Sequence, residues 1–158
     1  MNGLTVIDDE RIKLMEELLR LSPAEKAFIE VSNIIATTPI SQITGEALLQ
    51  PLRENGIAPE AARPRFRIIY SHVLKHFVLD RNLTDQEESE LDHLKQLLGL
   101  SQADVEEVFE SVVSRTYEHI ALRATADEGE AGRVERLLEL SKSLKIPEEV
   151  ARQILSKL

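Results

Sequence analysis

Two histidines and an aspartate could form a metal site on one helix. His72, His76 and Asp80 are spaced four residues apart, and that spacing places side chains on one face of a helix. Two imidazoles and a carboxylate in this arrangement could bind Zn²⁺ if a neighbouring helix adds a fourth ligand, for which His119 is the candidate. The alternative interpretation is structural: His72 and His119 are partly buried core residues beside a tyrosine, and His76 is exposed.

A second candidate cation site lies in the acidic turn that begins at Asp80. The first, third, fifth and ninth positions of this turn carry oxygen-bearing side chains, as in a calcium-binding loop. A standard loop is not expected, because Asp85 stands where a glycine is required and Leu91 where the bidentate glutamate is required. A looser site built on Asp80 and Glu87 could still hold Ca²⁺ or Mg²⁺. The alternative is that Thr84 and Glu87 cap the following helix.

One basic cluster stands out in an otherwise acidic chain. Residues 63–67 read Arg-Pro-Arg-Phe-Arg, and an aromatic ring between arginines could stack on a nucleobase or grip a phosphate. Because the formal net charge is −9, we expect this cluster instead to pair with the chain's own acidic helices or with an acidic partner. The acidic runs at 85–92 and 104–110 are interpreted as solvated helix faces, which could also dock a basic partner.

No residue pattern indicates catalysis. The sequence contains no Gly-rich phosphate loop and no recognisable Ser-His-Asp arrangement, and it has only six glycines in total. Cysteine is absent, which excludes a thiol nucleophile, a disulfide framework and an iron–sulfur site. We therefore expect a protein that is not an enzyme.

Amphipathic helices must position all of these residues, and we expect an all-α, compact bundle of about seven helices. Apolar residues recur at spacings of three and four along the chain, and capping boxes begin at Ser22 and Thr84. Strand signals are poor, with 4% aromatic residues. Proline is expected to delay one helix until after Pro64, and residues 126–132 are expected to form a small acidic loop.

An internal pseudo-repeat covers the two C-terminal thirds of the chain. Residues 70–73 (Tyr-Ser-His-Val) match residues 117–120 (Tyr-Glu-His-Ile), and residues 100–101 match residues 146–147. The repeated unit is a helix, an acidic turn, a second helix and the start of a third, with a period of about 46 residues. A fainter echo of the same break lies at residues 56–58 (Gly-Ile-Ala).

Part of this repeat resembles the tellurite-resistance TerB-like family. The resemblance lies in residues 79–87 (Leu-Asp-Arg-Asn-Leu-Thr-Asp-Gln-Glu), in Leu91 and Leu94, and in residues 98–101 (Leu-Gly-Leu-Ser). It extends over roughly residues 66–158, where 126–130 resembles a second, degenerate copy of the acidic turn. The resemblance implies a helical bundle, a role in stress-linked assemblies, and a divalent cation held by Asp80 and Glu87. The chain departs from the family pattern at Arg81, where the family prefers glycine, and at Arg133, where it prefers glutamate.

Length and composition set the remaining expectations. The 158 residues, 42% of them apolar, fit a single all-helical domain, with N-terminal helices in 1–63 and two TerB-like repeats in 64–158. The pI of about 5.0 argues against a general nucleic-acid binder. The sequence shows no membrane-spanning apolar run and no secretory pattern, so a cytoplasmic location is expected. The predicted function is a protein–protein interaction or stress-associated adaptor module, and the alternative is a regulatory domain that binds a divalent metal.

Overall fold

The chain folds into α-helices. The computed structural model describes residues 4–79, 82–123, 129–146 and 148–156, and within these ranges it contains eight α-helices, one short 3₁₀ helix and no strand. The described side chains exclude those of residues 16–19, 117–123, 129–131, 133–134, 137 and 154–155. The predicted all-α bundle is thus confirmed. None of the described helices is both long enough and apolar enough to cross a lipid bilayer.

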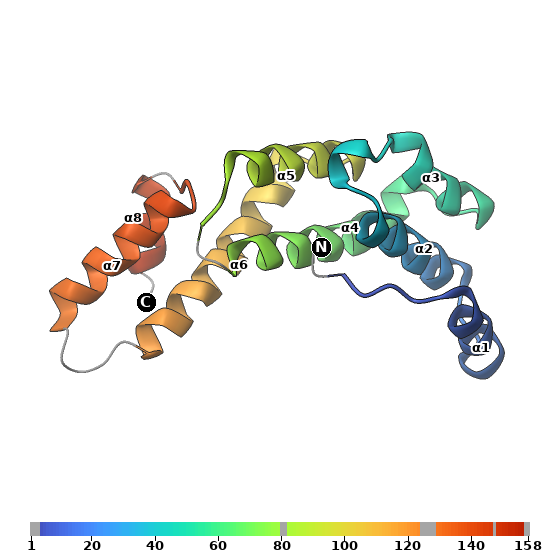
Figure 1. The fold of residues 1–158 in the computed structure, drawn as a ribbon, viewed down its shortest axis with the longest axis horizontal. Coiled ribbons are helices and arrows are strands. Elements are labelled where there is room, and N and C mark those ends of the chain that lie inside the picture. The colour runs from blue at the N-terminus through green and yellow to red at the C-terminus, as the bar shows by residue number, and fades with distance from the viewer. Residues whose placement is uncertain (1–3, 80–81, 124–128, 147, 157–158) are drawn as a thin grey trace.

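The helices follow one another with short connections. Their bounds are α1 Asp9–Leu19, α2 Pro23–Thr37, η1 Ile40–Gln42, α3 Gly45–Glu54, α4 Pro59–Val78, α5 Asp85–Leu97, α6 Gln102–Arg123, α7 Gly129–Ser143 and α8 Glu148–Ser156. In Figure 1 the helices α1, α2 and α3 gather at one end of the molecule and α7 and α8 at the other, with α4, α5 and α6 between them.

A single cluster of buried apolar side chains runs from α2 to α8. The central helix α4 packs against α2, α5 and α6, and it contributes Ile69, Val73 and Leu74, each at most 1% exposed. Burying a side chain of this size stabilises the folded state by roughly 1.5–3 kcal/mol. The apolar stripes of the amphipathic helices therefore hold the bundle together.

Four odd-numbered helices end in the same way. A left-handed residue follows each of α1, α3, α5 and α7, namely Arg20 (φ 52°), Gly56 (φ 66°), Gly99 (φ 62°) and Lys145 (φ 57°). An apolar residue follows each of these four positions, and the next helix begins three residues after the left-handed residue in every case. A left-handed residue at this position lets the chain reverse direction while satisfying the last carbonyl groups of the helix.

Three of these turns share one long backbone hydrogen bond. The N–H groups of Ile57, Leu100 and Ile146 donate to carbonyl oxygens five residues back, at 2.8, 3.1 and 2.9 Å. The turns at Gly99 and Lys145 are separated by the period of about 46 residues that the sequence predicts. The turn at Gly56 coincides with the fainter echo of the repeat at residues 56–58. The sequence analysis missed the turn at Arg20, because arginine lacks the conformational signature of glycine.

Two predicted helix boundaries were wrong. The helix α4 begins at Pro59, not after Pro64, which lies inside it. Proline at the first helical position is favourable, since it has no N–H to leave unpaired. Burial of Ala62 and Phe66 on either side of Pro64 stabilises a continuous helix. The expected loop at 126–132 is also too long, because α7 begins at Gly129.

Candidate functional site

The two predicted histidine ligands lie on α4 in different surroundings. His72 is exposed, whereas His76 is half-buried, and its ring centroid lies 6.2 Å from that of Phe77. The alternative interpretation, a partly buried His72 and an exposed His76, is therefore wrong for both residues. The side chain of His119 is outside those that the structure describes.

Glu87 is engaged in capping α5. Its backbone N–H donates to Thr84 Oγ1 at 3.1 Å. Its Oε1 accepts hydrogen bonds from the Thr84 N–H at 3.3 Å and from the Thr84 hydroxyl at 2.9 Å. This is the capping box that the sequence predicts. It satisfies backbone donors that the first turn of a helix leaves unpaired.

The predicted metal site reaches beyond the described part of the chain. Asp80, which both versions of the site require, lies outside the described residues. Within the described residues, no group of three or more His, Cys, Asp or Glu side chains could hold a metal ion. A cation site completed by Asp80, with Glu87 or with His72 and His76, stays a prediction.

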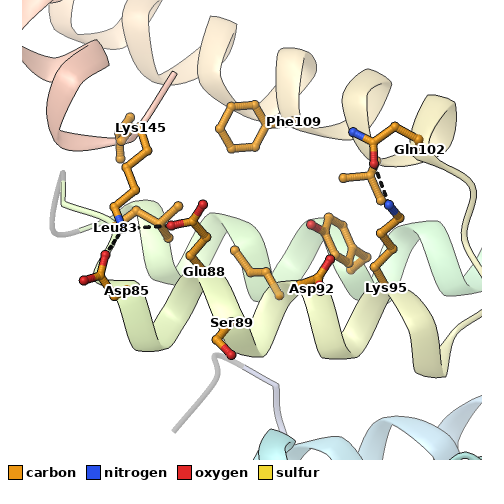
Figure 2. A pocket seen from close by; sticks show the side chains of 13 residues that line it. Leu83, Asp85, Glu88, Ser89, Asp92, Lys95, Gln102, Phe109 and Lys145 are labelled. Carbon is orange, nitrogen blue, oxygen red and sulfur yellow. Dashed lines mark hydrogen bonds and ion pairs between the residues drawn. The ribbon is translucent and has the colours of Figure 1, made fainter. Parts of the chain in front are cut away.

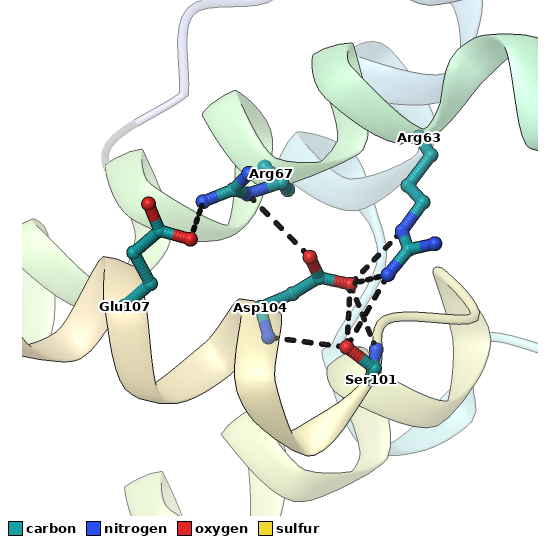
Figure 3. Close-up of polar contacts among 5 residues, drawn as sticks. All are labelled: Arg63, Arg67, Ser101, Asp104 and Glu107. Carbon is teal, nitrogen blue, oxygen red and sulfur yellow. Dashed lines mark hydrogen bonds and ion pairs between the residues drawn. The ribbon is translucent and has the colours of Figure 1, made fainter.

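Asp104 is the centre of a polar network that joins α4 to the start of α6 (Figure 3). Its Oδ2 accepts hydrogen bonds from Arg63 Nε at 2.9 Å, from Arg63 Nη2, and from the Ser101 N–H at 3.0 Å. In return, the Asp104 N–H donates to Ser101 Oγ at 3.1 Å, which caps α6. The bonds from Arg63 and then Ser101 lower the pKa of Asp104 to about 2. Asp104 is 8% exposed, so the prediction of a solvated acidic face was wrong at this residue.

The rest of the basic cluster is also engaged within the chain. Arg67 Nη2 lies 2.8 Å from Glu107 Oε2, a second link between α4 and α6. The Arg65 guanidinium lies 5.4 Å from the centroid of the Phe28 ring, at a distance typical of a cation–π contact. Phe66 is 3% exposed, so its ring is not available for stacking on a base. The expected pairing of these arginines with the chain's own acidic helices is confirmed for Arg63 and Arg67.

A cleft of about 520 Å³ lies between α5 and α6 (Figure 2). Helix α5 provides one wall, helix α6 the other, and the remaining lining comes from α4 and from the residues just before α5 and after α7. The lining residues are Tyr70, Leu83, Asp85, Glu88, Ser89, Leu91, Asp92, Lys95, Gln102, Val105, Phe109, Leu144 and Lys145. Val105 and Phe109 are half-buried, so the α6 wall offers apolar surface that the core does not fully cover.

Polar contacts close the cleft at both ends. At one end, Lys145 Nζ donates to Asp85 Oδ1 and to Glu88 Oε2, the latter at 2.8 Å. The hydrogen bonds and charges of Asp85 and Glu88 raise the pKa of Lys145, and Lys145 lowers the pKa of Asp85. At the other end, Lys95 Nζ donates to Gln102 Oε1. Figure 2 shows Phe109 facing the open space between these two contacts.

A buried phenol also lines the cleft. Tyr70 of α4 is 3% exposed. Burial and then the negative charge of Asp92 raise the pKa of Tyr70 to about 12. The hydroxyl therefore keeps its proton at neutral pH and can donate a hydrogen bond.

Sequence reasoning missed the cleft, because its lining comes from segments that are far apart in the chain. One signal was available. The predicted apolar stripe of α6 included Val105, Val108, Phe109, Val112 and Val113, which is a wider stripe than one packing face needs. In the structure Val108, Val112 and Val113 are buried, and Val105 and Phe109 face the cleft.

Comparisons with known proteins leave the family open. No protein-family model, no curated protein and no solved structure matches the chain. The TerB-like resemblance therefore depends on the residues quoted above and stays a prediction.

Proposed function

We propose that the protein is an interaction module that binds a segment of another protein in the cleft between α5 and α6. The observation that carries this proposal is the half-buried pair Val105 and Phe109, which lines an open cleft of about 520 Å³. Apolar surface left at a concave site is a mark of ligand or partner binding. The proposal keeps the adaptor role and the cytoplasmic location that the sequence predicts.

The framework around the cleft supports a binding role. Capping boxes fix the starts of α5 and α6, and the Arg63–Asp104 contact ties α6 to α4. The cleft walls are therefore preorganised, and rigid walls reduce the entropy that a binding site loses when its partner docks. Two helices, α5 and α6, form the walls of the cleft. Grooves of this kind often accept a helical segment of a partner protein.

The experiment is a selection of binding peptides from a random display library against the full chain. Selected peptides are then tested against two cleft variants, Val105→Arg, which places a charged side chain in the cleft, and Phe109→Ala, which removes apolar contact area. Matched controls are Ile68→Arg and Ile68→Ala, at an apolar residue of α4 that is 51% exposed and does not line the cleft. Circular dichroism melts verify that each variant is folded.

We expect both cleft variants to weaken binding at least tenfold and both Ile68 variants to leave it unchanged. A selection that yields no binding peptide would contradict the proposal. Binding that is equally strong in the Val105 and Phe109 variants would also contradict it, since the contact would then lie elsewhere on the molecule.

A further inference from the structure

We propose that the occupant of the cleft is an amphipathic helix of a basic partner protein, with apolar residues on one face and Lys or Arg along the edge next to α5. This inference rests on the proposed function and adds the chemistry of the partner. The charge of α5, the apolar stripe of α6 and the polar groups inside the cleft support this choice of partner.

The wall formed by α5 is strongly acidic. Five carboxylates fall within its first eight residues, namely Asp85, Glu87, Glu88, Glu90 and Asp92. Lys145 forms ion pairs with both Asp85 and Glu88 at one end of the cleft, so its single charge offsets one of these two carboxylates. Asp92 lines the middle of the cleft and is exposed, and its Oδ2 accepts a long hydrogen bond of 3.4 Å from Gln96 Nε2. Asp92 is therefore the carboxylate best placed to pair with a cation on the occupant.

Helix α6 also carries carboxylates, which lie outside the lining of the cleft. Glu106 and Glu107 lie on this helix next to Val105, and both are exposed. Glu107 pairs with Arg67 of α4, whereas Glu106 accepts a hydrogen bond from Gln102 at 3.1 Å. An occupant with positive charge along the edge next to α5 complements the carboxylates of that helix, whereas an acidic occupant would be repelled by them.

The two lysines that line the cleft do not reverse this preference. Lys145 is bound to Asp85 and Glu88, and Lys95 is bound to Gln102 across the turn between α5 and α6. Among the described lining residues there are thus three carboxylates and two lysines, and one of the lysines already serves two of the carboxylates. Lys95 keeps its charge because Gln102 is neutral, so the lining has an excess of one carboxylate, and the further negative charge of α5 lies outside the lining.

The apolar part of the cleft matches a helix in its spacing. Val105 and Phe109 are four residues apart on α6 and form a short stripe. A partner helix presents its own stripe at the same spacing of three and four residues, so its side chains can interdigitate with this pair. The lining residues of α5 run from Asp85 to Lys95, a wall of roughly 15 Å at about 1.5 Å per residue, which accommodates about three turns of a partner helix.

The test uses three synthetic peptides of equal length and the full chain. The first has a Leu stripe at helical spacing with Lys on both edges, the second has Glu in place of every Lys, and the third is a scrambled form of the first that keeps its charge and loses its stripe. Binding is measured by fluorescence anisotropy at low and at high salt. Three variants accompany the wild type: Asp92→Asn, Asp92→Lys, and Glu139→Gln as a control that removes one charge on an exposed residue of α7.

We expect the Lys peptide to bind at least tenfold more tightly than the Glu peptide and the scrambled peptide, with binding weakened by salt. Asp92→Asn should weaken it about two- to fivefold, the range for one exposed ion pair, and Glu139→Gln should leave it unchanged. Asp92→Lys should reduce the difference in binding affinity between the Lys peptide and the Glu peptide. Each of these variants changes an exposed side chain, so its folding can be verified by thermal melts.

Three results would overturn the inference. The first is that the Glu peptide binds as tightly as the Lys peptide, and the second is that the scrambled peptide binds as tightly as the ordered one. The third is that the chain self-associates in sedimentation and that Val105→Arg abolishes this association, which would make a second copy of the chain the occupant. In the first two cases, library peptides that remain sensitive to Val105→Arg would leave the proposed function standing. The failure of the inference is thereby separated from the failure of the function.

Discussion

Replacing Gly99 with alanine tests the turn that connects α5 to α6 and shapes one end of the cleft. Gly99 has φ 62°, and a Cβ built there meets no atom within 4 Å. The cost is therefore conformational rather than steric crowding. A left-handed backbone costs a residue with a Cβ about 1–2 kcal/mol. Alanine also reduces the conformational entropy of the unfolded chain, and this offsets about 0.4–1 kcal/mol of that cost. We expect Gly99→Ala to lower the free energy of unfolding by about 1 kcal/mol.

The chain contains a matched control for this substitution. Gly45 is the first residue of α3, a Cβ built there also meets nothing within 4 Å, and its φ is not in the left-handed region. Gly45→Ala should therefore raise stability by about 0.5 kcal/mol, through the unfolded state. Urea unfolding followed by circular dichroism measures both effects, and a change of 1 kcal/mol shifts the melting temperature of a chain of this size by about 2–4 °C. Equal changes of the same sign in Gly99→Ala and Gly45→Ala would refute the reasoning.

Three further outcomes are expected. Hydrogen bonds from Arg63 and Ser101 hold the pKa of Asp104 at about 2, below its unfolded value of 3.8. This carboxylate therefore adds stability above pH 3.8 that is lost as the pH falls towards 2. In urea melts, the free energy of unfolding of Asp104→Asn should fall less over that pH interval than that of the wild type. Leu94→Ala, at a fully buried position, should lower the free energy of unfolding by about 2–5 kcal/mol; a loss under 1 kcal/mol would contradict the packing. Thermal melts with Ca²⁺, Mg²⁺, Mn²⁺ or Zn²⁺ test the predicted cation site: a site that includes Asp80 should give a rise in melting temperature that grows with ion concentration and is lost in Asp80→Ala, and no rise with any of the ions would contradict it.

Local interactions are what the sequence predicts best. The capping boxes that start at Ser22 and Thr84 involve residues three positions apart, and both form as expected. Helix ends marked by glycine were recognised at Gly99, whereas the equivalent turn at Arg20 was not, since its residue type carries no such signal. The extension of α4 back to Pro59 was missed for a different reason, because tertiary burial outweighs the local cost of a proline.

Long-range contacts are what sequence reasoning could not specify. Arg63 and Asp104 are 41 residues apart, and only the packing of α4 on α6 brings them together. Acidic residues are abundant in the chain, so sequence alone gives no reason to choose Asp104 as the partner of Arg63. The same argument holds for the cleft, where Tyr70 of α4, Asp92 of α5 and Lys145 after α7 line one cleft only because the helices pack together.

The central claim is that the cleft between α5 and α6 is the surface that binds a partner. The most direct measurement is the mapping of amide chemical shifts in the labelled full chain during titration with the tightest-binding library peptide. The account predicts that the largest changes fall on Asp92, Val105 and Phe109, with little change around the exposed Ile68 and Leu14. Changes centred on Ile68 or Leu14, with the cleft residues unmoved, would contradict it.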